Sequence, residues 1–302
     1  MEPSEIGLGF AAMISLPSAT ARRERARVNA PVSMETLDGV DARGWSSQQI
    51  EARFDVTRAR DRYGRAALPG EVGCTLAHLA AMRRFLDCTT GGGDQTLGLI
   101  TEDDTAWTGG SVTALAHSAA LDHEFTLLWP EESSPSFKEV HTIRKMPGGL
   151  ELVRPLPFPR STLAYLVSRR AAKTIVQRAR RPFWIADDYQ ALREIGVDVR
   201  AIPQFPVARQ DVTSTVDAGG GREASYFSLQ PRLSLLRGRK SFLVRFRTVE
   251  ERRMRRWHRH ADAYARLPLP VRASALGRAA SIVINDAATG PLPPQRLAAR
   301  LG

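Results

Sequence analysis

The chain has 302 residues, of which 43% are hydrophobic and 25% are charged, a composition typical of a globular protein with a large core. Two cysteines are too few for a disulfide framework, and no apolar run reaches the ~20 residues that a membrane-spanning helix needs. We therefore expect a cytoplasmic protein with no leader peptide, at most peripheral on the inner face of the cytoplasmic membrane.

The net charge is unevenly distributed along the chain. Residues 222–272 contain 14 Lys or Arg and 4 Asp or Glu, which accounts for +10 of the total of +11. The stretch DAGGGREAS just before this basic region has the composition of a linker. We therefore predict two parts, a domain over residues 1–216 and a basic, mostly helical extension over residues 217–302.

Apolar runs and turn residues in the first part predict an alternation of strands and helices. Such an alternation indicates an α/β fold with a mainly parallel central sheet. In the first hundred residues we expect a buried strand at 9–16, a helix that begins at Ser18 and a helix that begins at Ser46 or Ser47. We also expect a long helix that follows Pro69, Gly70 and Gly73 and ends at the glycines 91–93. Further along we expect strands at 97–101 and 124–130, followed by a long loop with one hairpin at 131–160. We then expect a strand through Val167 that turns into a helix at Ser168. The last elements of this part are a helix at 184–196 with acids in its first turn and a short strand in a proline-interrupted segment at 197–210.

Three consecutive acids, Glu102, Asp103 and Asp104, directly follow the apolar strand in the stretch LGLITEDDTAW. In open α/β sheets, side chains at the carboxyl ends of strands project into the crevice where ligands bind. Adjacent carboxylates repel one another, and a hard cation such as Mg²⁺ or Mn²⁺ would neutralise them and keep substrate phosphates as its other ligands. The alternative is that these acids cap the next segment or face water.

Several motifs occur in the order and spacing of glycosyltransferase family 25, the lipopolysaccharide biosynthesis glycosyltransferases. The resemblance covers roughly residues 10–216 and rests on MISLPSATARRERA, LDGVDARG, LPGEVGCTLAHLAAMRRFL, LGLITEDDTAW, LAYLVSRRAAKTIV, WIADDY and VARQDVTSTV. It implies a GT-A-like nucleotide-sugar-binding fold. It also implies a metal-dependent, inverting transfer of a sugar, commonly galactose, from a UDP-sugar to lipopolysaccharide or a related lipid-linked glycan.

The resemblance also implies roles for particular residues. Asp104 would be the principal ligand of Mn²⁺ or Mg²⁺, with Asp103 and Glu102 at the metal or at the donor. The arginine cluster near the start and the glycine-cysteine-histidine block would lie near the donor. The chain departs from the family at Ala77, where the family usually has a serine before the histidine. A role for a hydroxyl group at this position is therefore not implied for this chain. The residues that we expect at the donor on this ground are Arg22, Arg23, Glu71, His78, Glu102, Asp103 and Tyr165.

An inverting transfer needs a base for the acceptor hydroxyl. Asp187 and Asp188 match the second acidic pair of the family, and we prefer Asp188. The alternative is that one of the two stabilises the following helix by interacting with the positive end of its dipole. For Cys74, we favour buried packing over a role as a nucleophile.

The basic extension lies outside the resemblance. Thr248 and Glu251 form a capping-box pattern for a helix with an apolar stripe among six arginines between 252 and 266. This pattern is typical of a helix on an anionic membrane surface, but a stripe that packs on the first domain would look the same. The alternative function is a nucleic-acid-binding or membrane-surface scaffold protein without catalysis. We expect no nucleic-acid partner, because no recognition motif accompanies the charge.

Overall fold

The computed structural model describes residues 1–130, 140–155 and 161–210. The basic extension, with its predicted helix and linker, lies outside the described residues. The helices are η1 (Pro3–Ile6), α1 (Thr20–Val28), α2 (Ser47–Glu51), α3 (Val56–Tyr63), α4 (Pro69–Cys88), α5 (Ser111–Ala119), η3 (Pro147–Gly149), α6 (Arg169–Arg178) and α7 (Tyr189–Glu194). The strands are β1 (Phe10–Ser15), β2 (Glu35–Asp38), β3 (Leu97–Glu102), β4 (Thr105–Trp107), β5 (Phe125–Pro130), β6 (Val140–Lys145), β7 (Glu151–Pro155), β8 (Ala164–Ser168), β9 (Val199–Phe205) and β10 (Val207–Arg209).

Eight strands form one central sheet in the order β2-β1-β3-β8-β5-β9-β7-β6, and β4 and β10 form a small antiparallel pair. β1 runs parallel to β2 and β3, and β5 runs parallel to β9. β8 runs antiparallel to both of its neighbours, and the β6–β7 hairpin extends the edge antiparallel to β9. The α/β class is confirmed, but the sheet is mixed, so the prediction of a mainly parallel sheet is wrong. A parallel neighbour requires a crossover connection, and the described part between β5 and β8 forms a hairpin instead.

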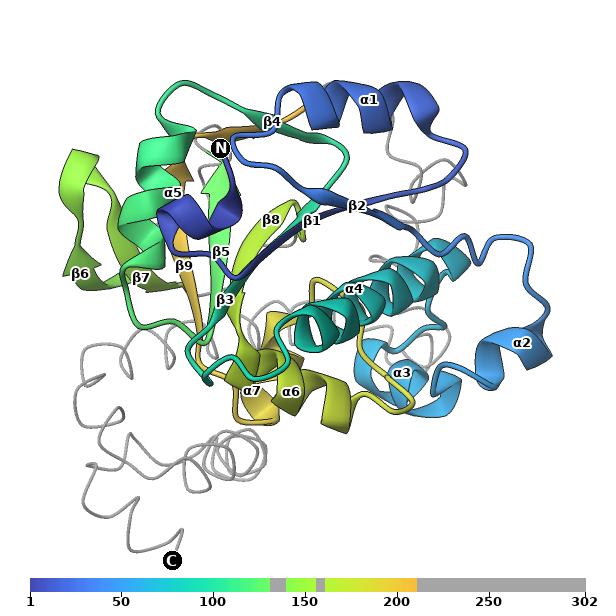
Figure 1. The fold of residues 1–302 in the computed structure, drawn as a ribbon. Coiled ribbons are helices and arrows are strands. Elements are labelled where there is room, and N and C mark those ends of the chain that lie inside the picture. Colours follow the sequence, from blue (N-terminus) through green and yellow to red (C-terminus); the bar gives the residue numbers. More distant parts are fainter. Residues whose placement is uncertain (131–139, 156–160, 211–302) are drawn as a thin grey trace, which may run out of the picture.

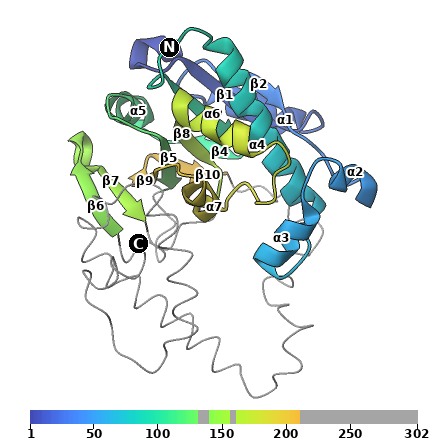
Figure 2. The same ribbon diagram turned by 90° about the horizontal axis from the view of Figure 1, so that it is seen from below.

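The strands β1, β3, β5 and β8 in the middle of the sheet are covered on both faces, which explains why they are apolar almost throughout. Side chains of β1 alternate between two cores: Phe10, Ala12 and Ile14 pack with α4 and α6, whereas Ala11 packs with α5. Figures 1 and 2 show α4 and α6 side by side on one face of the sheet. A smaller core around Phe54 and Val72 joins α3 to the start of α4.

The long helix α4 begins at Pro69, so the glycines expected to precede it lie inside its first turns. Gly73 is required there for packing, because a Cβ atom at this position would lie 2.3 Å from the carbonyl oxygen of Val40. The helix therefore approaches the segment after β2 more closely than any other residue type would allow.

Most of the other element predictions are confirmed with small shifts. Ser46 forms a capping box at α2, and Ser168 ends β8 and caps α6 by accepting a hydrogen bond from the backbone of Ala171. α1 begins at Thr20, two residues after the predicted start. Among the described residues, no helix has the length and apolar character needed to cross a membrane.

Candidate functional site

A cleft lies at the carboxyl ends of β1, β2 and β3. Because these strands are parallel, their last residues meet at one edge: Ile14 pairs with Glu102, and Ser15 pairs with Asp38. The cleft holds about 590 Å³ of space, a volume that includes open solvent. It is lined by Ile14, Ser15, Leu16, Arg22, Gly39, Val40, Asp41, Arg43, Gly70, Cys74, Ala77, His78, Glu102 and Asp103.

Glu102 is the last residue of β3, and its contacts gather on the oxygen Oε1. His78 Nε2 lies 3.1 Å from this oxygen, Cys74 Sγ lies 3.9 Å from it, and the hydroxyl of Thr162 donates to it. Burial opposes ionisation of Glu102, but the hydrogen bonds from His78 and Thr162 and the charge of His78 outweigh it and lower the pKa to about 2. The carboxylate is therefore ionised at neutral pH.

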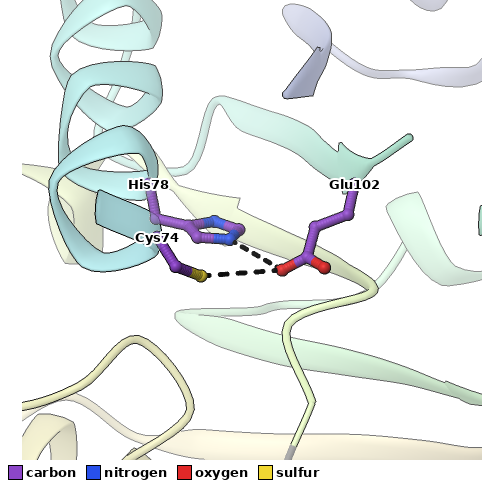
Figure 3. A group of neighbouring side chains, drawn as sticks. All are labelled: Cys74, His78 and Glu102. Carbon is purple, nitrogen blue, oxygen red and sulfur yellow. Dashed lines mark hydrogen bonds and ion pairs between the residues drawn. The ribbon is translucent and has the colours of Figure 1, made fainter. Parts of the chain in front are cut away.

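His78 connects Glu102 to the interior of the domain. Its Nδ1 lies 2.9 Å from the hydroxyl of Tyr165, a fully buried residue of β8. Cys74 lies one turn before His78 on α4, so both side chains point at Glu102 (Figure 3). The ligand atoms of Cys74, His78 and Glu102 all lie within 4.8 Å of one another. Tyr165 thus stands behind His78 rather than in the lining of the cleft.

Asp103 is held by β1 and α1. Ser15 donates its hydroxyl proton to Oδ2 at 2.6 Å, and Arg22 lies 3.0 Å from Oδ1. Arg23 turns elsewhere: it donates to the backbone oxygen of Ser15 and pairs with Asp38. Of the two arginines predicted at the donor, only Arg22 lines the cleft.

Asp104 is not part of the cleft lining, although Glu102 and Asp103 are. Arg209 of β10 donates to its Oδ2 at 3.1 Å, whereas Oδ1 is buried and has no hydrogen-bond partner. Burial and the charges of Glu102 and Asp103 outweigh Arg209 and raise the pKa of Asp104 to about 6. The three acids therefore do not form one continuous carboxylate surface, although their charges remain coupled.

Glu71 does not line the cleft either. It is buried, its two oxygens accept hydrogen bonds of 2.7 and 2.6 Å from Arg65, and it also accepts from the backbone N–H of Leu68 at the start of α4. Both carboxylate oxygens are engaged in holding the helix start, so the expected contact with a donor has no support in this arrangement.

Asp188, the preferred base, is engaged by four donors. Arg62 donates twice, Tyr63 donates its hydroxyl proton, and the backbone of Ala191 donates to it as the N-cap of α7. Burial opposes ionisation of Asp188, but Arg62, Tyr63 and the cap outweigh it and lower the pKa. α7 begins only at Tyr189, so the acids precede the first turn rather than lie in it. Asp188 therefore stabilises the local structure, as the alternative interpretation of one acid of this pair expected.

Asp187 is half-buried next to it. Its charge, like that of Glu102, helps to raise the pKa of the buried Tyr189, after the larger effect of burial. Asp187 and Glu102 therefore both lie close enough to Tyr189 for their charges to act on its phenol.

Other polar residues at the cleft had no role assigned from the sequence. Asp41 and Arg43, from the motif LDGVDARG, form a two-point ion pair on its rim, and the hydrogen bond from Arg43 lowers the pKa of Asp41 to about 2. Ser15 and Thr162 orient Asp103 and Glu102. The only sequence signal for Arg43 was its place in a motif quoted for the resemblance, since a charged pair two residues apart is common on surfaces.

A scan against models of protein families finds no match for this chain, and a search of curated proteins finds none.

Proposed function

We propose that the chain is a glycosyltransferase that uses a divalent metal and moves a sugar, in the first instance galactose, from a UDP-sugar to lipopolysaccharide or a related glycan, with inversion and within a GT-A-like fold. The observation that carries the proposal is the cleft at the carboxyl ends of three parallel strands, which is lined by Glu102, Asp103, Arg22 and Arg43. Its position and its mixture of charges suit a nucleotide sugar better than an apolar ligand.

The arginines supply the attraction for the diphosphate of the donor. Arg22 and Arg43 enter the cleft from different elements, α1 and the segment after β2. Each is paired with one carboxylate, Asp103 or Asp41, in the absence of a ligand. A guanidinium can give up an exposed partner for phosphate oxygens in the same two-point geometry, and Arg43 is half-exposed. His78 and Glu102 at the base of the cleft are then placed for the sugar or ribose hydroxyls.

The side chain of Asp104 fits a role in binding a hard cation. Its Oδ1 is buried without a hydrogen-bond partner, and its pKa is raised first by burial and then by the charges of Glu102 and Asp103. Mn²⁺ or Mg²⁺ would satisfy that oxygen and offset the charges of Asp103 and Glu102. When bound, such a cation neutralises the charge that develops on the departing diphosphate.

The base is assigned to Asp187. Asp188 has four hydrogen-bond donors on its two oxygens, and removing a proton from an acceptor hydroxyl would compete with all of them. Asp187 lies just before α7, and its charge and that of Glu102 both act on Tyr189. A carboxylate there can accept the proton of an acceptor hydroxyl that attacks the sugar from the face opposite the diphosphate.

A donor screen with Asp104→Asn tests the proposal. We expect UDP-sugars to raise the melting temperature of the parent chain only when Mn²⁺ or Mg²⁺ is present, and we expect UDP-galactose to be hydrolysed slowly under those conditions. In Asp104→Asn, UDP-sugars with metal should no longer raise the melting temperature; this rise is called the donor response below. Without ligands, the variant should melt at or above the temperature of the metal-free parent, because the raised pKa indicates that the ionised carboxylate is unfavourable in the fold.

Asp87→Asn is the matched control, since this exposed acid lies near the far end of α4. It should keep the full metal-dependent response. Equal donor responses in Asp104→Asn and the parent would remove Asp104 from the site. No response to any UDP-sugar with either metal would overturn the proposed function.

A further inference from the structure

Three potential ligands of another kind of metal ion meet at the cleft wall. Cys74 and His78 are four residues apart on α4, on the face turned toward the end of β3, and Glu102 comes to them from that strand (Figure 3). Their ligand atoms are a thiol sulfur, an imidazole nitrogen and a carboxylate oxygen. Sulfur and nitrogen are ligands of borderline-soft ions such as Zn²⁺, whereas Mg²⁺ and Mn²⁺ prefer oxygen alone.

The spacing of the three atoms is close to that of a tetrahedral site. Bonds of ~2.0–2.3 Å place the ligand atoms of tetrahedral Zn²⁺ about 3.3–3.8 Å apart. Here, Glu102 Oε1 lies 3.1 Å from His78 Nε2 and 3.9 Å from Cys74 Sγ, and no pair exceeds 4.8 Å. Small rotations of side chains that line an open cleft are enough to bring the set to bonding distances.

The surroundings of His78 support ligation through Nε2. Metal-bound histidines usually use their other ring nitrogen in a hydrogen bond that fixes the orientation of the ring. Nδ1 of His78 lies 2.9 Å from the buried hydroxyl of Tyr165, and that leaves Nε2 directed at Glu102 and the cleft. A phenol can either donate to Nδ1 or accept from it, so Tyr165 can hold the ring both without an ion and with one.

The charges of the set also balance. A thiolate and a carboxylate together offset a divalent cation, and the imidazole binds as a neutral ligand. On binding, the thiol of Cys74 loses its proton to solvent and forms the metal–sulfur bond. Nε2 of His78 likewise releases the proton that it shares with Glu102 and forms the metal–nitrogen bond, while Nδ1 carries the ring proton and donates it to the hydroxyl oxygen of Tyr165. Because all three residues line the cleft, a fourth position remains on the open side, as in sites with three protein ligands and one exchangeable ligand.

We propose that Cys74 Sγ, His78 Nε2 and Glu102 Oε1 form a binding site for a borderline-soft divalent ion, Zn²⁺ or Co²⁺, that is separate from the hard-cation site assigned to Asp104. The site goes beyond the proposed function and does not require it. Asp104 contributes nothing to this set, since it pairs with Arg209 and lies outside the cleft lining.

Titration of the full-length, tag-free chain with Co²⁺ tests the site. We expect one equivalent to produce the absorption bands of a tetrahedral ion together with a thiolate-to-cobalt charge-transfer band, and Zn²⁺ to displace it. Cys74→Ser should lose the charge-transfer band, and His78→Ala should weaken binding by at least tenfold. Cys74→Ala provides a second variant if Cys74→Ser does not fold.

Two controls make the outcome decisive. Cys88→Ser changes the other cysteine of the chain, an exposed residue at the end of α4, and should bind Co²⁺ as the parent does. Asp104→Asn should also keep the full spectrum while losing the donor response. Tyr165→Phe should weaken binding by about 10- to 100-fold without removing the charge-transfer band, as expected for a residue that positions a ligand.

A cobalt spectrum without a thiolate band in the parent chain, or one that survives Cys74→Ser and Cys74→Ala unchanged, would overturn the site. So would the absence of stoichiometric binding at micromolar Co²⁺ and Zn²⁺. Loss of the donor response together with an intact cobalt spectrum would count against the proposed transferase alone.

Discussion

At the scale of single residues, the acids of this domain differ in how fully their charge is compensated. Asp188 accepts four hydrogen bonds, two of them from one guanidinium. Asp104 accepts one side-chain hydrogen bond and keeps a buried oxygen without a partner. A compensated carboxylate stabilises the fold, whereas an uncompensated one costs stability and is kept only where it serves another purpose.

Asp188→Asn tests the structural side of this contrast. The amide keeps the cap on Ala191 but removes the charge that Arg62 faces, so we expect a loss of about 2–4 kcal/mol in the free energy of unfolding at pH 7. Because the folded protein lowers the pKa of Asp188 below its ordinary value of 3.8, its contribution is complete above that value. The contribution is lost as the pH falls through the lower pKa of the folded state.

Urea denaturation of parent and variant over a range of pH measures this difference. The gap between them should be constant near neutral pH and should narrow under acid conditions. Glu24→Gln, which breaks an exposed ion pair with Arg27 on α1, should leave the urea midpoint unchanged. A gap for Asp188→Asn that widens as the pH falls would contradict the assigned role.

At the scale of elements, the close packing of α4 on the segment after β2 positions one wall of the cleft. Gly73 lies against the backbone of residues 40–42, and the next turn carries Cys74 and His78 toward β3. A helix held further away would withdraw both side chains from Glu102. The glycine is therefore part of the geometry of the site, although it offers no side chain to a ligand.

Gly73→Ala tests this packing. In an unhindered helix, Ala stabilises by about 1 kcal/mol relative to Gly, but here its methyl group would meet the oxygen of Val40, and overpacking of this kind costs ~1–3 kcal/mol. We expect the variant to be less stable in urea denaturation and to bind Co²⁺ more weakly than the parent. Gly44→Ala, at a position with open space around it, should do neither. An increase in stability for Gly73→Ala would show that α4 does not pack this closely.

At the scale of the whole molecule, charge is separated along the chain. Residues 222–272 hold +10 of the net +11, so the described domain is close to neutral while its cleft carries charges of both signs. An attraction to anionic lipid would therefore arise from the extension, at about 1 kcal/mol for each Arg near the surface. For an enzyme with a lipid-linked acceptor, such an attraction would keep it beside its substrate.

Replacement of Arg252, Arg253, Arg255 and Arg256 by Gln in the full chain tests this idea. We expect binding to vesicles with anionic lipid to weaken by about 100- to 1,000-fold, and we expect the parent to dissociate as salt is raised. The matched control replaces four exposed arginines of the domain, Arg83, Arg178, Arg180 and Arg181, and should bind vesicles nearly as well as the parent. Retention on duplex DNA that exceeds retention on vesicles would favour the nucleic-acid alternative instead.

Much of the local structure could be predicted because its causes lie within a few residues. The apolar run before Glu102 predicted β3, and Ser46 and Ser168 marked the starts of two helices through their own side chains. The direction of β8 could not be predicted in this way. It runs antiparallel to both β3 and β5, and periodicity carries no information on direction.

The same distinction between local and long-range causes applies to the candidate site. By itself, the sequence determined that acids follow a buried strand, that arginines and a cysteine–histidine pair lie in nearby motifs, and that the basic charge is concentrated in the extension. Only the tertiary structure shows that Asp104 forms an ion pair with Arg209 and that Asp188 forms one with Arg62. It also shows that the side chains of Cys74 and His78 lie next to Glu102. These partners are 24 to 126 residues apart in the chain, and only the packing of whole elements brings such side chains within hydrogen-bond distance.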